Sequence, residues 1–255
     1  MQLRYRRTVP LLAICLVLTA APALAAKPQP VKAGTPGGAQ HEIHLGETQG
    51  GAGAGCALGV LPPALGVFGY ILPPDDEYYQ LINPADCAEC KGGPVMLTNA
   101  HIALYFTAAC QIPVTVIVRP ALQIAPGCLG PNPFGTPICE PTEYQVNDGG
   151  ILGDCVDYSF PLPAACCLEG PAFLEFQFDP GTCPTSRPAF CGPAACSNCA
   201  QFNYYPGAPA PSGDDLCVVL TPFGFAGIDM WADAVCCGAT PTHNGSWGLL
   251  KTLYR

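Results

Sequence analysis

Residues 173–178 read Phe-Leu-Glu-Phe-Gln-Phe, and this stretch decides the fold class. Leu174, Phe176 and Phe178 recur at every second position, and Glu175 and Gln177 occupy the positions between them. Because successive side chains of a β-strand point to opposite faces, the stretch predicts a half-buried strand with one apolar face.

Other short segments of the chain share this strand-like composition. His101–Phe106 and Pro113–Val118 are rich in β-branched and aromatic residues, and we expect them to be neighbouring antiparallel strands around Cys110. No segment of the sequence predicts a long amphipathic helix. We therefore predict an all-β fold, an antiparallel β-sandwich for which a jelly roll is one arrangement. Further strands are expected at Val67–Leu72, Glu143–Val146, Val156–Phe160, Leu216–Leu220, Ile228–Ala234 and Trp247–Tyr254.

The N-terminus resembles a cleavable export signal. Arg4, Arg6 and Arg7 precede the apolar run Val9–Leu18, and Ala23–Ala25 supplies the small residues that a signal peptidase needs. We predict cleavage after Ala25 or one residue later. An uncleaved anchor is the alternative, but an apolar core of about ten residues is roughly half of what a membrane-spanning helix requires. The expected location is secreted, extracellular or periplasmic, with no transmembrane segment left after cleavage.

Composition divides the rest of the chain into a linker and one domain. Residues 26–55 are rich in Gly and Pro without apolar periodicity, and they predict a flexible linker. Residues 56–255 then form a disulfide-stabilised β-sandwich domain. Removal of the signal peptide lowers the number of Lys and Arg from 10 to 7, against 19 Asp and Glu. This acidic balance excludes nucleic acid as an expected partner, because phosphate binding needs clustered basic residues.

The chain has 17 cysteines, of which one, Cys15, lies in the signal peptide. A dense, even set of cysteines in an exported protein predicts a disulfide framework. The doublets Cys166-Cys167 and Cys236-Cys237 are expected to tie different segments together, because neighbouring side chains of a strand point apart. The disulfide candidates are Cys56, Cys87, Cys90, Cys110, Cys128, Cys139, Cys155, Cys166, Cys167, Cys183, Cys191, Cys196, Cys199, Cys217, Cys236 and Cys237.

Two cysteine pairs have the two-residue spacing used by zinc and redox sites. They are Cys87–Cys90 and Cys196–Cys199, and more than a hundred residues separate them. Structural disulfides are the favoured interpretation, because many other cysteines compete for the same partners. A thiol-redox or metal-binding role through these pairs stays open as an alternative function.

Asp229, Trp231 and Asp233 form the most suggestive candidate binding site. Their spacing of two predicts that they share one face of a strand. An exposed tryptophan between two carboxylates suits a sugar ring, which stacks on the indole while its hydroxyls donate to the acids. The alternative is that the tryptophan belongs to a core.

An enzymatic interpretation depends on carboxylates. Glu175, Asp179, Asp229 and Asp233 are candidates for the facing pair that glycoside hydrolysis needs, and a carbohydrate-active hydrolase is an alternative function. The sequence contains neither a Gly-x-Ser-x-Gly nor a His-Glu-x-x-His motif. Among the four histidines, only His101 falls on a predicted strand.

The sequence requires no cofactor, and calcium is the remaining candidate ion. Oxygen ligands gather in loops at residues 75–77, at residues 147–157 and at Asp214-Asp215, without the spacing of an EF-hand. Solvated acidic turns are the alternative explanation for these residues.

The C-terminal third carries a faint resemblance. The segments 223–237 and 246–255 resemble the ending of uncharacterised, cysteine-containing secreted bacterial proteins, which implies an exported bacterial β-rich module and no activity. Together these observations predict a secreted or cell-envelope, non-catalytic structural or adhesive module that binds carbohydrate or a surface protein.

Overall fold

The computed structural model describes residues 55–59, 66–71, 76–163, 166–179, 183, 188–192, 197–223 and 227–238, with the backbone alone at 66–71 and 223. The predicted signal peptide and the predicted strand Trp247–Tyr254 lie outside the described residues. So does the predicted linker, except for Gly55, which is the first residue of a strand.

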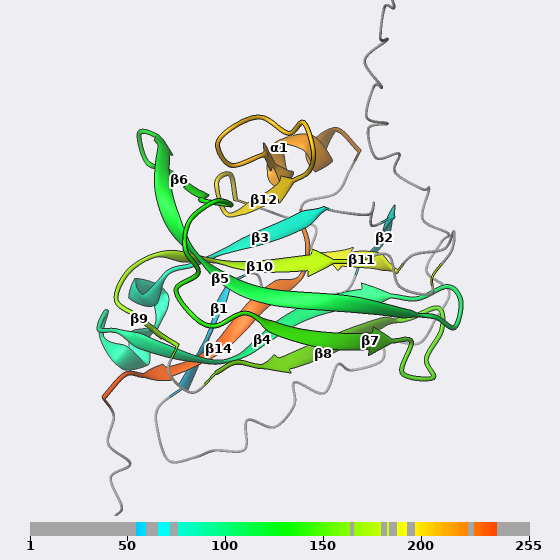
Figure 1. The fold of residues 1–255 in the computed structure, drawn as a ribbon, viewed down its shortest axis with the longest axis horizontal. Helices are drawn as coiled ribbons and strands as arrows, with labels where there is room; N and C mark the ends of the chain where they lie inside the picture. The colour runs from blue at the N-terminus through cyan, green and yellow to red at the C-terminus, as the bar shows by residue number, and fades with distance from the viewer. Residues whose placement is uncertain are drawn as a thin grey trace, which may run out of the picture.

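The described residues form two antiparallel β-sheets, as the sequence predicts (Figure 1). The β5 sheet has the order β13–β12–β3–β10–β5–β6, and β7 pairs with another part of β5. Its strands are β3 (Glu77–Ile82), β5 (Gln111–Ala125), β6 (Cys128–Pro131), β7 (Thr142–Asn147), β10 (Ala172–Phe178), β12 (Gln201–Tyr204) and β13 (Asp214–Asp215).

The β4 sheet has the order β1–β14–β4–β11–β2, and both β8 and β9 pair with β4. Its strands are β1 (Gly55–Gly59), β2 (Gly66–Ile71), β4 (Val95–Tyr105), β8 (Cys155–Pro161), β9 (Cys167–Leu168), β11 (Ala189–Gly192) and β14 (Met230–Cys236).

The helices in the described residues are short. The 3-10 helices are η1 (Pro84–Asp86), η2 (Ala88–Cys90) and η3 (Thr221–Phe223), and the α-helix is α1 (Leu216–Leu220). None of the described helices has the length and apolar composition to cross a membrane. The strand predicted at Leu216–Leu220 is wrong, because the Asp215 side chain accepts a hydrogen bond from Cys217 N–H and caps a helical turn there.

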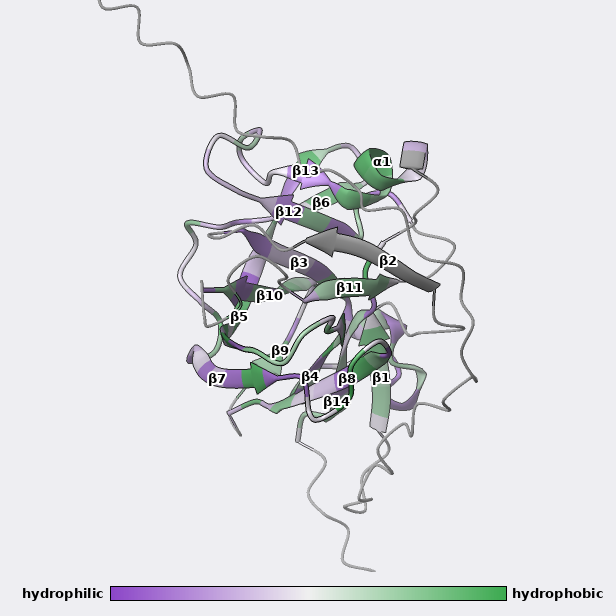
Figure 2. Cartoon of the chain, turned by 90° about the vertical axis from the view of Figure 1, so that its right-hand side faces the viewer, coloured by the Kyte–Doolittle hydropathy of each residue, from purple (hydrophilic) through white to green (hydrophobic). Residues whose placement is uncertain are grey.

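The main core lies between the two sheets. Leu174, Phe176 and Phe178 of β10 pack in it, and so do Ile102 of β4 and Met230 of β14. Figure 2 shows the apolar residues of the chain by colour in a side view of the same arrangement. Burial of these alternate positions is what stabilises the sandwich, and it confirms the face that the sequence assigns to residues 174, 176 and 178.

The second face of β10 is also buried, which differs from the half-buried strand that we predict. Tyr79, Phe173 and Phe202 form a smaller cluster on the outside of the β5 sheet, and residues of the β5–β6 hairpin pack against it. Figure 1 shows that hairpin beside β12 and α1 at one end of the molecule. The outer cluster covers Phe173, and this explains why both faces of β10 exclude water.

The predicted pairing of the segments around Cys110 is wrong. His101–Phe106 belongs largely to β4 and Pro113–Val118 to β5, and these strands lie in different sheets. The chain therefore crosses from one sheet to the other near Cys110. Local composition predicts each strand but contains no information about its partner.

Seven disulfides join the described cysteines, which fits an oxidising compartment. The two cysteine doublets bridge different segments, as predicted, and Cys167–Cys237 joins one doublet to the other. Cys217 is also disulfide-bonded, whereas Cys196 lies outside the described residues. The pairs are Cys56–Cys87, Cys90–Cys236, Cys110–Cys183, Cys128–Cys199, Cys139–Cys166, Cys155–Cys191 and Cys167–Cys237.

Candidate functional site

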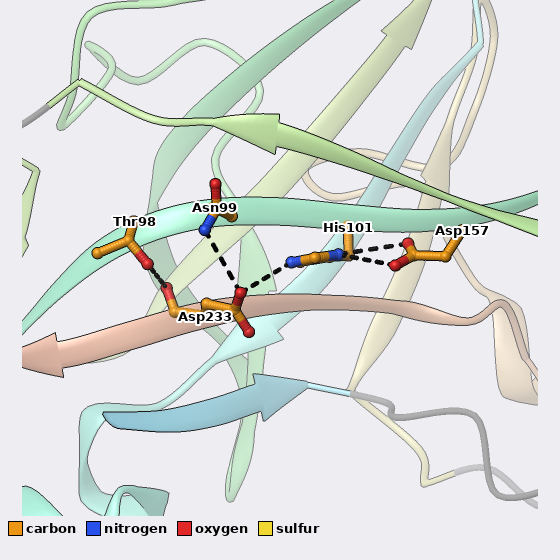
Figure 3. A network of polar contacts seen from close by, with 5 residues as sticks. All are labelled: Thr98, Asn99, His101, Asp157 and Asp233. Atoms are coloured by element: carbon orange, nitrogen blue, oxygen red, sulfur yellow. Dashed lines mark hydrogen bonds and ion pairs between the residues drawn. The ribbon is translucent and has the colours of Figure 1, made fainter. Parts of the chain in front are cut away.

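A histidine lies between two carboxylates on the outer face of the β4 sheet (Figure 3). His101 Nδ1 lies 3.1 Å from Asp157 Oδ2, and His101 Nε2 lies 3.1 Å from Asp233 Oδ2. The three residues come from β4, β8 and β14, and β4 is the central strand of the three. Each carboxylate therefore reaches the imidazole from a neighbouring strand, one from either side.

Strand alternation fixes the face on which this group lies. Ala100 and Ile102 pack in the main core, so His101 between them points away from it. On β14, Met230 and Ala232 pack in the core in the same way. The period of two predicted for this segment is thus confirmed, because Trp231 and Asp233 share the face opposite the core.

A β-bulge in β4 adjoins the site. Asp233 pairs with Asn99 and Ala234 pairs with Leu97, so Thr98 is an extra residue on β4. Thr98 Oγ1 donates to the Asp233 carbonyl at 3.3 Å, and Asn99 Nδ2 donates to the Asp233 carboxylate at 3.4 Å. The bulge lets Leu97 and Ala100 both face the core, and it restores the alternation that points His101 outward.

Trp231 is the platform on which His101 lies. The two rings are parallel, with an interplanar angle of 7° and centroids 4.8 Å apart. The residue is only 2% exposed. The prediction that Trp231 is exposed is therefore wrong. The imidazole occupies one face of the indole, and a sugar ring has no free access to that face.

The surroundings of His101 favour its charged form. Burial lowers its pKa, but the hydrogen bonds and the negative charges of Asp157 and Asp233 outweigh burial and raise the pKa to about 9. At neutral pH the ring is an imidazolium that donates both N–H groups. Its position on the indole adds a cation–π contact.

This protonation state restricts the chemistry of the group. A protonated imidazole with both N–H groups donated has no free lone pair, so it accepts no proton and binds no metal ion. The cluster of one cation and two carboxylates carries a net charge of −1. The arrangement holds three strands together on their outer face, which is a structural role.

Asp229 lies next to this group in the chain but does not join it. Its backbone N–H donates to Cys191 O at 2.9 Å, and its carbonyl accepts from Ala103 N–H at 3.0 Å. The side chain is fully buried, and its carboxylate oxygens have no hydrogen-bond partner among the described residues. Burial alone raises the pKa of Asp229 to about 7. Of the three predicted site residues, the structure thus brings Trp231 and Asp233 together on His101 and leaves Asp229 outside the hydrogen-bonded group.

Glu175 and Asp233, two of the four carboxylates considered for hydrolysis, do not face one another. Glu175 is on the outer face of the β5 sheet, where Arg119 Nε donates to it at 2.5 Å. Asp233 is on the outer face of the β4 sheet, so the whole core separates the two. Burial raises the pKa of Glu175 to about 7, and the hydrogen bond from Arg119 opposes this shift. Glu175 is fully buried and serves as the partner of the half-buried Arg119.

Four of the acidic residues considered as calcium ligands accept hydrogen bonds from the protein, and one further candidate, Asp75, lies outside the described residues. Asp76 accepts from Tyr78 Oη at 3.2 Å, and Asp214 accepts from Tyr205 Oη at 2.8 Å. Asp215 caps α1, and Asp157 binds His101. These contacts explain their positions without an ion.

Cys87 and Cys90 are the pair with two-residue spacing of which the structure describes both members, and they are not bonded to each other. Cys87 is bonded to Cys56, and Cys90 is bonded to Cys236. Cys199 is bonded to Cys128. The sulfurs of Cys56, Cys87 and Cys90 lie within 4.8 Å of one another, but none of them is a thiolate that could bind a metal ion in this oxidised state.

The sequence contains the components of the site without a pattern that joins them. His101 is predicted only as a histidine on a strand, and Asp157 only as a candidate calcium ligand. The three residues are separated by 56 and 132 positions in the chain. Their meeting depends on which strands flank β4, and no local motif encodes that order.

Comparison with protein families, with curated proteins and with solved structures finds no match for this chain. The resemblance of the C-terminal third to secreted bacterial proteins stays a prediction.

Proposed function

We propose that this protein is a secreted or cell-envelope, non-catalytic module that binds glycans through an exposed aromatic surface. The disulfide framework supports its location outside the cytoplasm, because such bridges persist in oxidising compartments. The protonated His101 and the separated carboxylates support a non-catalytic role. The contact surface differs from the one that the sequence suggests, since Trp231 is buried.

The observation that carries the proposal is the exposure of Phe134. This residue follows β6 and is 80% exposed, and its ring meets the ring of Tyr204 edge to face, with centroids 5.8 Å apart. The two residues together are called the Phe134 surface below. A large aromatic side chain held in water against a second ring is a common means of binding the apolar face of a partner.

The segment that carries Phe134 is held firmly in place. Arg119 Nη1 donates to Gly135 O at 2.8 Å, and Ile138 N–H donates to Val118 O at 2.8 Å. A Cβ atom at Gly135 would lie 2.7 Å from the Pro120 side chain, so the segment approaches β5 closely. The aromatic ring is therefore presented by an ordered segment, which reduces the entropy lost on binding.

Polar groups are near Tyr204 in the chain and in the pairing of its strand. Tyr205 follows Tyr204 in the chain, and its hydroxyl donates to the Asp214 carboxylate at 2.8 Å. Asp214 pairs with Asn203 across β13 and β12. A sugar that stacks on Phe134 would find a carboxylate and a hydroxyl as partners for its own hydroxyls.

The test is binding of the oxidised, signal-free protein to a panel of immobilised polysaccharides. We expect Phe134→Ala to weaken binding about tenfold, which corresponds to a loss of about 1.4 kcal/mol. Val218→Ala is the matched control, because Val218 is 57% exposed on α1 and should leave binding unchanged. A wild-type protein that binds none of the glycans, or a Phe134→Ala variant that binds as well as wild type, would overturn the proposal.

A further inference from the structure

We propose that Cys56, Cys87, Cys90 and Cys236 form a thiol–disulfide exchange site, in which an external dithiol reduces Cys90–Cys236 and the freed Cys90 then takes Cys87 from Cys56. The four residues are called the cysteine square below. The proposal goes beyond glycan binding and does not depend on it.

Both disulfides of the cysteine square converge on one short turn. Cys87 directly precedes η2 and Cys90 is the last residue of η2, and Cys90 N–H donates to Cys87 O at 3.1 Å. One disulfide joins this turn to β1 through Cys56, and the other joins it to β14 through Cys236. The turn brings two sulfurs that are not bonded to each other to a distance of 3.3 Å, from Cys87 Sγ to Cys90 Sγ.

That distance is within the range of about 3–3.5 Å at which reacting atoms are held before a reaction. The Cys56 and Cys90 sulfurs lie within 4.8 Å, so the attacking sulfur is not yet in line with the Cys56–Cys87 bond. A rotation of the freed Cys90 side chain about its χ1 angle is needed to align it, and no longer-range movement of the turn is required.

Exposure and charge indicate which disulfide reacts first. Both members of Cys90–Cys236 are half-buried, whereas Cys56–Cys87 combines a half-buried Cys56 with a fully buried Cys87. Glu89 Oε2 lies 3.7 Å from Cys87 Sγ and disfavours negative charge there.

The exchange balances in two steps. A thiolate of the external dithiol attacks Cys236 Sγ and breaks the Cys90–Cys236 bond; the second thiol of the dithiol then releases Cys236 and leaves as a cyclic disulfide. The dithiol is oxidised by two electrons, and Cys90 and Cys236 are reduced. Cys90 thiolate next attacks Cys87 Sγ, forms Cys87–Cys90 and expels Cys56 as a thiolate that takes a proton, with no further change in oxidation state.

The product differs from the starting structure at one edge of the β4 sheet. β1 is the terminal strand in the order of that sheet, and Cys56 is its one cysteine. After the exchange, β1 is no longer linked covalently to the η1–η2 turn. Reaction with an external dithiol therefore removes the disulfide that ties the edge strand β1 to this turn.

The test uses wild-type protein treated with less than one equivalent of dithiothreitol, blocked with N-ethylmaleimide and mapped by peptide mass spectrometry. We expect peptides in which Cys87 and Cys90 are bridged and Cys56 and Cys236 are alkylated. If Cys90 and Cys236 are alkylated while Cys56–Cys87 stays intact throughout the time course, the proposal is wrong.

Two variants that lack the same disulfide provide a matched comparison. In Cys236→Ser we expect the internal bridge to form without added dithiol, so that Cys56 is the alkylated residue. In Cys90→Ser we expect Cys236 to be alkylated and Cys56–Cys87 to persist. Alkylation of Cys90 in the first variant, or of Cys56 in the second, would overturn the role of Cys90. If either variant fails to fold, the wild-type time course still decides.

Discussion

Stability of this protein should fall as pH rises from about 6.5 to about 9, because His101 loses its proton in that interval. The folded protein holds the proton with a pKa of about 9, and the unfolded chain holds it with a pKa of 6.5. Each difference of one in pKa corresponds to about 1.4 kcal/mol, so the Asp157 and Asp233 contacts contribute about 3 kcal/mol.

The direction follows from proton binding. Below pH 6.5 the imidazole is charged in both states, and the folded protein has the full benefit of the two carboxylates. As pH rises through 9 the folded protein also loses the proton, and the benefit disappears. His101→Gln removes the titrating group but keeps a side chain that donates hydrogen bonds.

The assay is urea unfolding with all disulfides intact, at pH 6 and at pH 10, for wild type and His101→Gln. The difference in unfolding free energy between wild type and variant should be about 3 kcal/mol larger at pH 6 than at pH 10. Groups that titrate equally in both proteins cancel in this comparison. A difference that is the same at both pH values, or an NMR titration of His101 in the folded protein with a midpoint below 7, would refute the reasoning.

Three further substitutions test how buried groups and close backbone contacts affect stability. Burial raises the pKa of Asp229 from 3.8 to about 7, so between these pH values only the unfolded chain ionises and the wild-type protein loses about 4 kcal/mol of stability from pH 4 to pH 8. Asp229→Asn should remove this decline, and parallel pH profiles of the two proteins would contradict this. Gly59→Ala should lower the free energy of unfolding in urea by about 1–3 kcal/mol, since φ is +115° and the new Cβ would lie 2.8 Å from a β14 carbonyl. Gly92→Ala is the control, because Gly92 has φ +74° in open space and its substitution measures the backbone strain alone. Leu174→Ala should lower the melting temperature through a loss of about 2–5 kcal/mol, and an equal loss for the 47%-exposed Ile151→Ala would show that core packing is not the cause.

The strands were predictable where a local pattern suffices. Alternation identified β10 and β14 with the correct core-facing residues, because burial of one face requires a period of two. The same reasoning failed at Leu216–Leu220, since a five-residue apolar run fits a helical turn as well as a strand. The cap by Asp215 decided between them, and this contact is local, because Asp215 lies two residues before Cys217.

The candidate site was predictable only in part. Asp233 and Trp231 were identified as partners on one face, but the third member, His101, enters through pairing between β4 and β14. The sequence predicts an exposed Trp231 because carboxylates lie two positions away on either side, at Asp229 and Asp233. In the structure it supports a charged imidazole, and the surface for glycan binding that we propose is formed instead by Phe134 and Tyr204.

By itself, the sequence determined the fold class, the disulfide-rich character and the rule that each cysteine doublet joins different segments. These properties follow from the alternation of side chains along a strand and from the number of cysteines. Tertiary structure alone decided which strands share a sheet, which cysteines pair, and which side chains meet at His101. These outcomes depend on contacts between residues tens to more than a hundred positions apart, and the free energy of such contacts is not encoded in any local pattern.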